Sequence, residues 1–158
     1  MVVRKPARTE MDSVYLMGMD VWNGGDSAKI YLEDCYASEK YEKGQWLVLT
    51  LEGELVSSLI VYRDGFNLPG NYFGIGSVAT RPEFRNAGYA AYLIEEVVSS
   101  IEDEECDGVY LFSDIGYEYY QKLGFSLLSS QSTTSENPCM VRRLKTATSI
   151  STKMPTYF

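Results

Sequence analysis

The sequence contains no histidine and only three cysteines, Cys35, Cys106 and Cys139. Without histidine, catalysis by a Ser–His–Asp triad or by a Cys–His pair is excluded. The cysteines are odd in number and lack the CxxC spacing that is typical of structural zinc ligands. The sequence therefore favours neither a zinc site nor a disulfide scaffold, and we expect no metal in the reaction.

Basic residues are few, with 14 Lys and Arg against 22 Asp and Glu, a net charge of −8 and no basic cluster. A nucleic-acid surface needs clustered positive charge, so we expect no nucleic-acid partner. An acidic protein attracts cationic small molecules such as amines, but acidity can also serve solubility alone. The charge leaves these two interpretations open.

Long apolar runs are missing as well. No segment approaches the roughly 20 apolar residues of a membrane span, and residues 1–12 lack the apolar core of a signal peptide. We therefore expect a cytoplasmic protein without a membrane partner. The 158 residues, 45% of them hydrophobic, suffice for one domain, which we assign to 1–145. Residues 146–158 are polar and without periodicity, and we expect a flexible tail there.

Apolar periodicity and turn residues predict the secondary structure. Strands are expected at 2–5, 45–51, 55–63, 72–80, 108–113, 125–129 and 139–144, and helices at 9–22, 28–38, 89–102 and 117–123. Antiparallel strands come first, and alternating strands and helices follow. This order predicts an α/β (α+β) fold with a mixed, mostly antiparallel central sheet flanked by helices.

The most informative stretch is 78–91, which reads VATRPEFRNAGYAA. An apolar strand leads through a turn marked by Pro82 into a small-residue loop, and a helix opens directly after it. Free N–H groups and the positive end of the dipole make such a helix start an anion site. Gly88 lacks a Cβ and so lets an anion approach the backbone, and Arg85 adds positive charge. The sequence predicts a phosphate-binding loop here, with a plain strand-to-helix turn as the alternative.

Two segments resemble motifs of the GNAT superfamily of acyl-CoA-dependent N-acetyltransferases. The loop resembles the family's Arg/Gln-x-x-Gly-x-Gly/Ala signature, and residues 117–125, YEYYQKLGF, resemble its Phe-Tyr-Glu-Lys-Leu-Gly-Phe segment. The predicted order of elements is also similar, so that the resemblance covers about 2–144. It implies a sheet splayed between its fourth and fifth strands, and acetyl-CoA as the co-substrate.

The resemblance also implies roles for particular residues. Val78 and Thr80, on either side of Ala79, would pair through their main chain with the pantetheine arm, and the Val78 N–H is our candidate oxyanion donor. Tyr120 takes the role of general acid beside the sulfur. The pyrophosphate of coenzyme A would be held by the loop, which consists of Arg85, Asn86, Ala87, Gly88, Tyr89 and Ala90.

Two positions at the end of the predicted strand 108–113 are less certain in role. Many members of the family carry an Asn that contacts the cofactor, seven residues before the catalytic Tyr. Ser113 stands at that position here, so we expect a serine in place of the usual Asn at the cofactor. Asp114 could accept the amine proton or hold a cationic substrate, or could simply cap the next helix.

The sequence thus predicts an N-acetyltransferase that moves an acetyl group from acetyl-CoA to a primary amine by direct attack in a ternary complex. The acceptor is a small-molecule or peptide amine, and the sequence leaves a homodimer open. An alternative is a non-catalytic acyl-CoA-binding sensor or interaction module on the same fold. A doubly wound nucleotide-binding domain is disfavoured, because Gly74-Ile75-Gly76 lies within a strand and lacks the third glycine.

Overall fold

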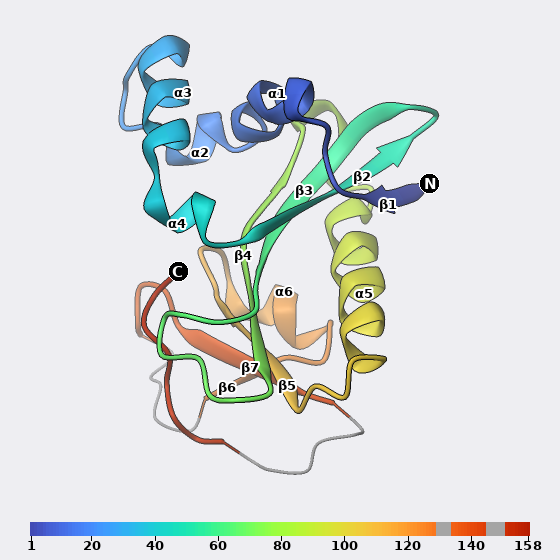
Figure 1. The fold of residues 1–158 in the computed structure, drawn as a ribbon, viewed down its shortest axis with the longest axis vertical. Helices are drawn as coiled ribbons and strands as arrows, with labels where there is room; N and C mark the ends of the chain where they lie inside the picture. Colours follow the sequence, from blue (N-terminus) through green and yellow to red (C-terminus); the bar gives the residue numbers. More distant parts are fainter. Residues whose placement is uncertain (129–133, 145–150) are drawn as a thin grey trace. The chain divides into compact units, whose positions relative to one another are not determined.

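The computed structural model describes residues 1–128, 134–144 and 151–158 (Figure 1). Its strands form one sheet in the order β1-β2-β3-β4-β5-β7-β6. The β4–β5 pair is parallel, and the pairs β1–β2, β2–β3, β5–β7 and β6–β7 are antiparallel. The predicted mixed sheet is therefore confirmed. The strands are β1 (Val2–Arg4), β2 (Gln45–Leu51), β3 (Glu54–Tyr62), β4 (Tyr72–Thr80), β5 (Gly108–Phe112), β6 (Ser126–Leu127) and β7 (Cys139–Arg143).

The described residues fall into two compact units. The first consists of Met1–Val61 and Ser77–Ile94, and the second of Tyr62–Gly76 and Glu95–Phe158. Strand β4 therefore contributes its beginning to the second unit and its end to the first.

The first unit has its core in β2 and β3, where Val48, Leu49, Leu59 and Ile60 are fully buried. Its helical segments are η1 (Arg8–Glu10), α1 (Met11–Leu16), α2 (Met19–Trp22), α3 (Ala28–Ala37) and α4 (Glu39–Glu42). Figure 1 shows α1 to α4 grouped together.

One helix that we predicted at 9–22 is interrupted in the structure. The break lies at Gly18, where an added Cβ would stand 2.0 Å from the ring of Trp22. Glycine therefore lets this ring pack directly on the backbone, at the cost of helix continuity. The sequence pattern did not predict α4, whose start is capped by the Ser38 hydroxyl, which accepts a hydrogen bond from the Tyr41 N–H at 3.3 Å.

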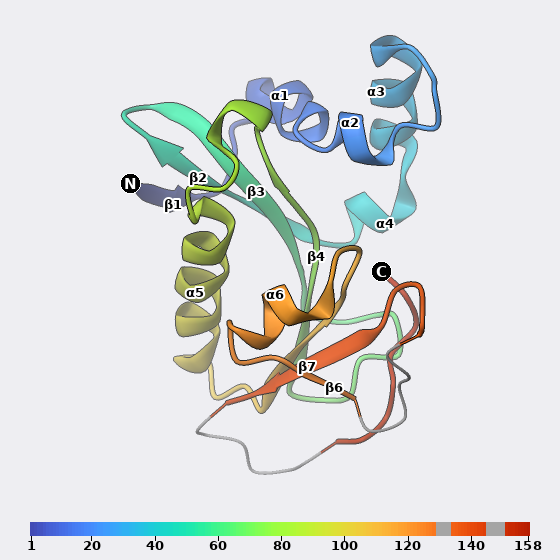
Figure 2. The ribbon, with the colours of Figure 1, turned by 180° about the vertical axis from the view of Figure 1, so that it is seen from behind.

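The second unit contains β5, β6, β7 and α6 (Tyr117–Gln121), which packs beside β6 (Figure 2). Tyr110, Leu111, Met140 and Val141 form part of its core. Of the predicted tail, residues 151–158 belong to this unit, with Phe158 buried, and residues 146–150 lie outside the described residues.

Helix α5 (Tyr89–Glu102) coincides with its predicted bounds. Its apolar positions recur at helical spacing, and Leu93, Ile94, Val97, Val98 and Ile101 are almost fully buried. The helix therefore gains most of its stability from packing, and its start fixes the end of the loop that precedes it.

The pairing of β4 with β5 is short. It runs from Tyr72 opposite Gly108 to Ile75 opposite Leu111, whereas β4 itself continues to Thr80. Two residues after the paired stretch, Ser77 adopts a φ of 48°, which is rare in a strand. The register agrees with the predicted splay between the fourth and fifth strands.

Candidate cofactor and catalytic site

The loop between β4 and α5 has the backbone that an anion site requires. Two of its residues lie in the left-handed region, Asn86 with a φ of 62° and Gly88 with a φ of 82°. The Tyr92 N–H donates to the Gly88 carbonyl at 2.9 Å, so the helix itself supplies no acceptor for the amides that precede Tyr92 in its first turn. Asn86, Ala87 and Gly88 are exposed, and Tyr89 and Ala90 are half-buried. Exposed residues at the positive end of a 14-residue helix have the backbone features that favour phosphate binding.

Gly88 has a structural reason to be glycine in addition to the predicted approach of an anion. An added Cβ would meet no atom within 4 Å in the structure, so the protein around the loop does not exclude a side chain. The left-handed φ is what makes a side chain costly at this position.

Arg85 has a partner that the sequence did not indicate. Its Nη1 and Nη2 atoms donate to the two carboxylate oxygens of Asp20 in α2, at 2.6 and 2.8 Å, and its Nε donates to the Thr80 carbonyl at 2.9 Å. The hydrogen bonds from Arg85 hold the pKa of Asp20 below its usual value. The guanidinium is thus committed to shaping the loop, and its charge is balanced by a carboxylate.

The end of β4 is held to β3 by side-chain contacts. The Ser57 hydroxyl donates to the Ala79 carbonyl at 2.7 Å and lies 2.9 Å from the Thr80 hydroxyl. Val78 is half-buried beside them. The carbonyls of Ala79 and Thr80 thus each accept a hydrogen bond from a side chain of the protein.

Tyr120 lies on α6 in the second unit and is 7% exposed. Burial raises the pKa of its phenol, and the charge of Asp114 and the neighbouring Tyr119 raise it further. The phenol therefore keeps its proton at neutral pH, as a general acid must. The rest of its motif forms the helix end, with the Phe125 N–H donating to the Tyr120 carbonyl at 3.1 Å and Gly124 in the left-handed region at a φ of 78°.

Ser113 and Asp114 follow β5 in the same unit but differ in exposure. Ser113 is fully buried, and its hydroxyl donates to the Ile115 carbonyl at 2.5 Å, so the side chain stabilises the turn. Asp114 is exposed and accepts a hydrogen bond from the Tyr157 hydroxyl at 3.3 Å. Sequence reasoning did not predict this contact, because Tyr157 lies in the segment that we expected to be flexible.

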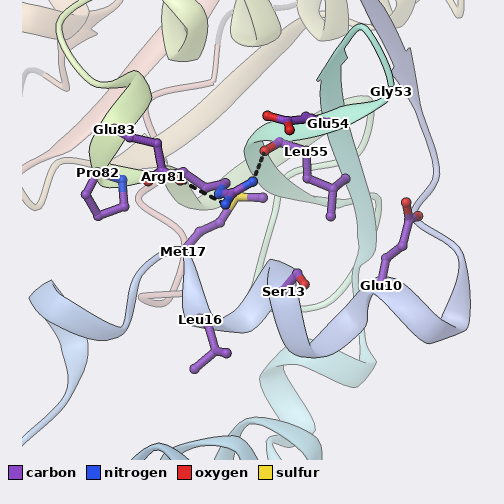
Figure 3. A pocket seen from close by; sticks show the side chains of 10 residues that line it. All are labelled: Glu10, Ser13, Leu16, Met17, Gly53, Glu54, Leu55, Arg81, Pro82 and Glu83. Carbon is purple, nitrogen blue, oxygen red and sulfur yellow. Dashed lines mark hydrogen bonds and ion pairs between the residues drawn. The ribbon is translucent and has the colours of Figure 1, made fainter.

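The first unit also contains a pocket of about 460 Å³ that sequence reasoning missed (Figure 3). Its walls come from α1, the start of β3 and the turn after β4. Arg81 donates to the Leu55 carbonyl at 3.2 Å and pairs with Glu83 at 2.8 Å. The lining residues are Glu10, Ser13, Leu16, Met17, Gly53, Glu54, Leu55, Arg81, Pro82 and Glu83. A second hollow of about 320 Å³ lies among α2, α3 and α4, with Trp22, Asp26, Tyr31, Asp34 and Tyr41 in its walls.

Within residues 1–128, 134–144 and 151–158, no three His, Cys, Asp or Glu side chains form a group that could hold a metal ion. In the same part of the chain, none of the helices combines the length and the apolar character needed to cross a membrane.

Comparison with known families gives one clear match. Residues 2–128 match the sequence model of the acetyltransferase (GNAT) domain. No curated protein sequence matches the chain.

Solved structures share the fold at low sequence identity. The GNAT family N-acetyltransferase YhbS from Escherichia coli, in complex with CoA, superposes with a TM-score of 0.67 at 17% identity, over 90% of this chain and 80% of that one. A GNAT family acetyltransferase from Brucella melitensis, in complex with acetyl-CoA, gives a TM-score of 0.62 at 18% identity, over 99% and 92%. The PaiA N-acetyltransferase from Thermoplasma acidophilum, in complex with coenzyme A, gives 0.66 at 12% identity, over 90% and 98%.

Proposed function

The chain belongs to the GNAT acetyltransferase family, and on this premise we propose that it transfers an acetyl group from acetyl-CoA to a primary amine. The observation that carries the proposal is the β4–α5 loop, in which the left-handed residues Asn86 and Gly88 lead into the start of α5. A diphosphate has several acceptor oxygens and a negative charge, and both suit a row of amides at the positive end of a helix.

In the proposed reaction, the amine nitrogen attacks the acetyl carbonyl of the thioester directly, in a ternary complex. Negative charge develops on the carbonyl oxygen, and a fixed N–H donor stabilises it. We assign this role to the Val78 N–H, which lies in the part of β4 beyond its paired stretch with β5. The C–N bond forms, the C–S bond breaks, and the thiolate of coenzyme A departs.

Tyr120 supplies the proton for the departing thiolate. A free phenol has a pKa near 10 and a thiol near 8.5, so a stepwise transfer from phenol to thiolate is uphill by roughly 2 kcal/mol. Burial raises the pKa of Tyr120 and so increases this mismatch. The transfer is therefore concerted with C–S cleavage, where the proton moves as charge accumulates on sulfur.

The amine must lose a proton for the overall reaction to balance. Asp114 is our candidate acceptor for that proton, since its carboxylate is exposed at the end of β5 and already orders one hydroxyl, that of Tyr157. A carboxylate at this position also attracts the acceptor amine while the amine is still protonated and cationic.

The test is a turnover screen that measures release of free coenzyme A thiol from acetyl-CoA with polyamines, aminoglycosides, amino acids and lysine peptides. The three cysteines of the protein are buried, and burial raises the pKa of each thiol, so they contribute little background to a thiol reagent. Reactions without an amine measure what background remains. Binding of acetyl-CoA without turnover on any amine would support the non-catalytic acyl-CoA-binding module instead.

A second measurement addresses the loop itself. Acetyl-pantetheine lacks the pyrophosphate, so it should bind far more weakly than acetyl-CoA if the loop holds that group. Equal affinities of the two thioesters would remove the basis of the assignment.

A further inference from the structure

Residues 151–158 cross the second unit and are attached to the side chains of β4 and β5. The Ser151 N–H donates to the Tyr72 hydroxyl at 3.1 Å, and the Tyr110 hydroxyl donates to the Lys153 carbonyl at 3.0 Å. Tyr72 and Tyr110 are neighbours on one face of the sheet, with ring centroids 5.2 Å apart. We call residues 151–158 the C-terminal strap.

The strap is also attached to the connection between β3 and β4, beside which it lies in Figures 1 and 2. The Thr156 N–H donates to the Phe66 carbonyl at 2.7 Å. The Asn67 side-chain amide donates to the Thr156 hydroxyl at 2.8 Å. Backbone and side-chain bonds together fix the register of the strap on this connection.

Phe158 anchors the strap in an aromatic cluster. Its side chain is 3% exposed, and its ring centroid lies 5.2 Å from those of Tyr62 and Phe112 and 5.6 Å from that of Phe66. Gly74 of β4 makes room for it, since an added Cβ there would stand 2.7 Å from the Phe158 ring. A glycine inside a strand is unfavourable by itself, and the packing of the Phe158 ring explains why β4 has a glycine at this position.

Tyr157 places the strap at Asp114. Its ring packs edge-to-face on Phe112 with centroids 5.1 Å apart, and its hydroxyl donates to Asp114 Oδ1 at 3.3 Å. The tyrosine is 48% exposed, so part of its side chain is open to solvent near the carboxylate. The strap thus brings an aromatic surface to the residue that we proposed as the proton acceptor.

We propose that the C-terminal strap forms a wall of the acceptor site, in which Tyr157 positions the Asp114 carboxylate and selects a compact cationic amine. This inference rests on the proposed function. An aromatic ring and a carboxylate at one site both attract an ammonium group, the ring by cation–π attraction and the carboxylate by charge. The Tyr157 hydroxyl occupies one site on Oδ1, and the other carboxylate oxygen can receive the amine. A bulky acceptor, such as a lysine side chain in a folded protein, has to displace the ring.

The test compares Tyr157→Phe, which removes only the hydroxyl, with Tyr157→Ala, which removes the wall. The side chain is half exposed, so both proteins should fold. Tyr36→Phe is the matched control, because the Tyr36 hydroxyl makes a similar exposed bond to Asp12, at 2.6 Å in the first unit. The acceptors are spermidine, as a compact cation, and a lysine-containing peptide.

We expect Tyr157→Phe to raise the KM for spermidine by about tenfold, the low end of the effect of losing a hydrogen bond to a charged group. The KM for acetyl-CoA should stay within about twofold of the wild-type value, because the substitution leaves every residue of the loop that we assign to the pyrophosphate unchanged. Tyr157→Ala should lower turnover of spermidine relative to turnover of the peptide. Equal KM values for spermidine in Tyr157→Phe and Tyr36→Phe would overturn the proposal.

Failure of the proposed function has a different signature. Calorimetric titration of spermidine into the protein loaded with coenzyme A measures acceptor binding without chemistry. If the wild type binds spermidine but shows no turnover, and Tyr157→Phe weakens that binding, the result supports the acceptor wall and contradicts the enzymatic function. If Tyr157→Phe leaves this binding unchanged, the acceptor wall falls whatever the turnover.

Discussion

Arg85 and Asp20 form a bidentate ion pair, with N–O distances of 2.6 and 2.8 Å, that joins the β4–α5 loop to helix α2. The same guanidinium reaches back to the Thr80 carbonyl at 2.9 Å. Arg85 therefore links three segments that meet in the first unit, and these bonds hold the loop in shape. We propose that Arg85 supports anion binding at least in part by positioning this loop.

Asp20→Asn should raise the KM for acetyl-CoA by about threefold to tenfold, while kcat at saturating acetyl-CoA changes little, because the substitution removes the charge and one of the two acceptors that tie the loop to α2 but leaves the loop amides in place. The loss of stability should stay below about 1 kcal/mol, since the pair is partly exposed. Steady-state kinetics and chemical denaturation check both values. Glu33→Gln, which breaks the exposed pair between Lys29 and Glu33, is the matched control and should leave the KM for acetyl-CoA unchanged.

Gly88→Ala should destabilise the protein by about 1–2 kcal/mol, the cost of a Cβ in the left-handed region, and should weaken acetyl-CoA binding as the loop changes conformation. Thermal unfolding and calorimetric titration with acetyl-CoA measure the two effects. Gly70→Ala is the control, because Gly70 is exposed, has no left-handed φ and has no atom within 4 Å of an added Cβ. Similar losses in both variants would contradict the role assigned to Gly88.

Tyr120→Phe should lower kcat by about a hundredfold or more and leave the dissociation constant of acetyl-CoA nearly unchanged, because it removes a proton donor and keeps the ring. Rapid-mix thiol-release kinetics and equilibrium binding separate the two quantities. Tyr119→Phe alters the adjacent phenol and should retain most of the activity. A Tyr120→Phe protein with wild-type kcat would show that the thiolate leaves without help from this group.

Glu10→Gln should change how stability depends on pH at the acid end. Hydrogen bonds from the Arg4 side chain and from the Ala7 N–H lower the pKa of Glu10 to about 2. A carboxyl group whose pKa is depressed by folding stabilises the protein above its unfolded pKa of about 4.3, and this contribution is lost as pH falls toward the folded value.

The difference in unfolding free energy between wild type and Glu10→Gln should therefore be constant above pH 5 and shrink between about pH 4.3 and pH 2. Denaturant titrations at pH 7, 4 and 3 measure it. The control is Glu96→Gln, at an exposed position of α5. A difference that is independent of pH across this range would contradict the assigned pKa.

Sequence reasoning succeeded where local physics decides the structure. Helix α5 has a strong apolar period, and the loop before it has small residues where the backbone turns, so both could be predicted from neighbouring positions. The break at Gly18 could not, because the Trp22 ring displaces a regular helix through packing. The partners Asp20 of Arg85 and Tyr157 of Asp114 lie 65 and 43 positions away in the chain, and no spacing rule connects them.

The contact between Gly74 and Phe158 also has a consequence for the divergence of this protein and its relatives. The Phe158 ring occupies the volume that a side chain at position 74 would need. A substitution at either position therefore changes which residues are tolerated at the other. We therefore expect the two positions to covary: relatives with an aromatic residue at the position of Phe158 should keep glycine in β4, and relatives without it should carry alanine or a larger residue there. Such covariation would show, from the sequences of relatives alone, which members of the family carry a strap of this kind.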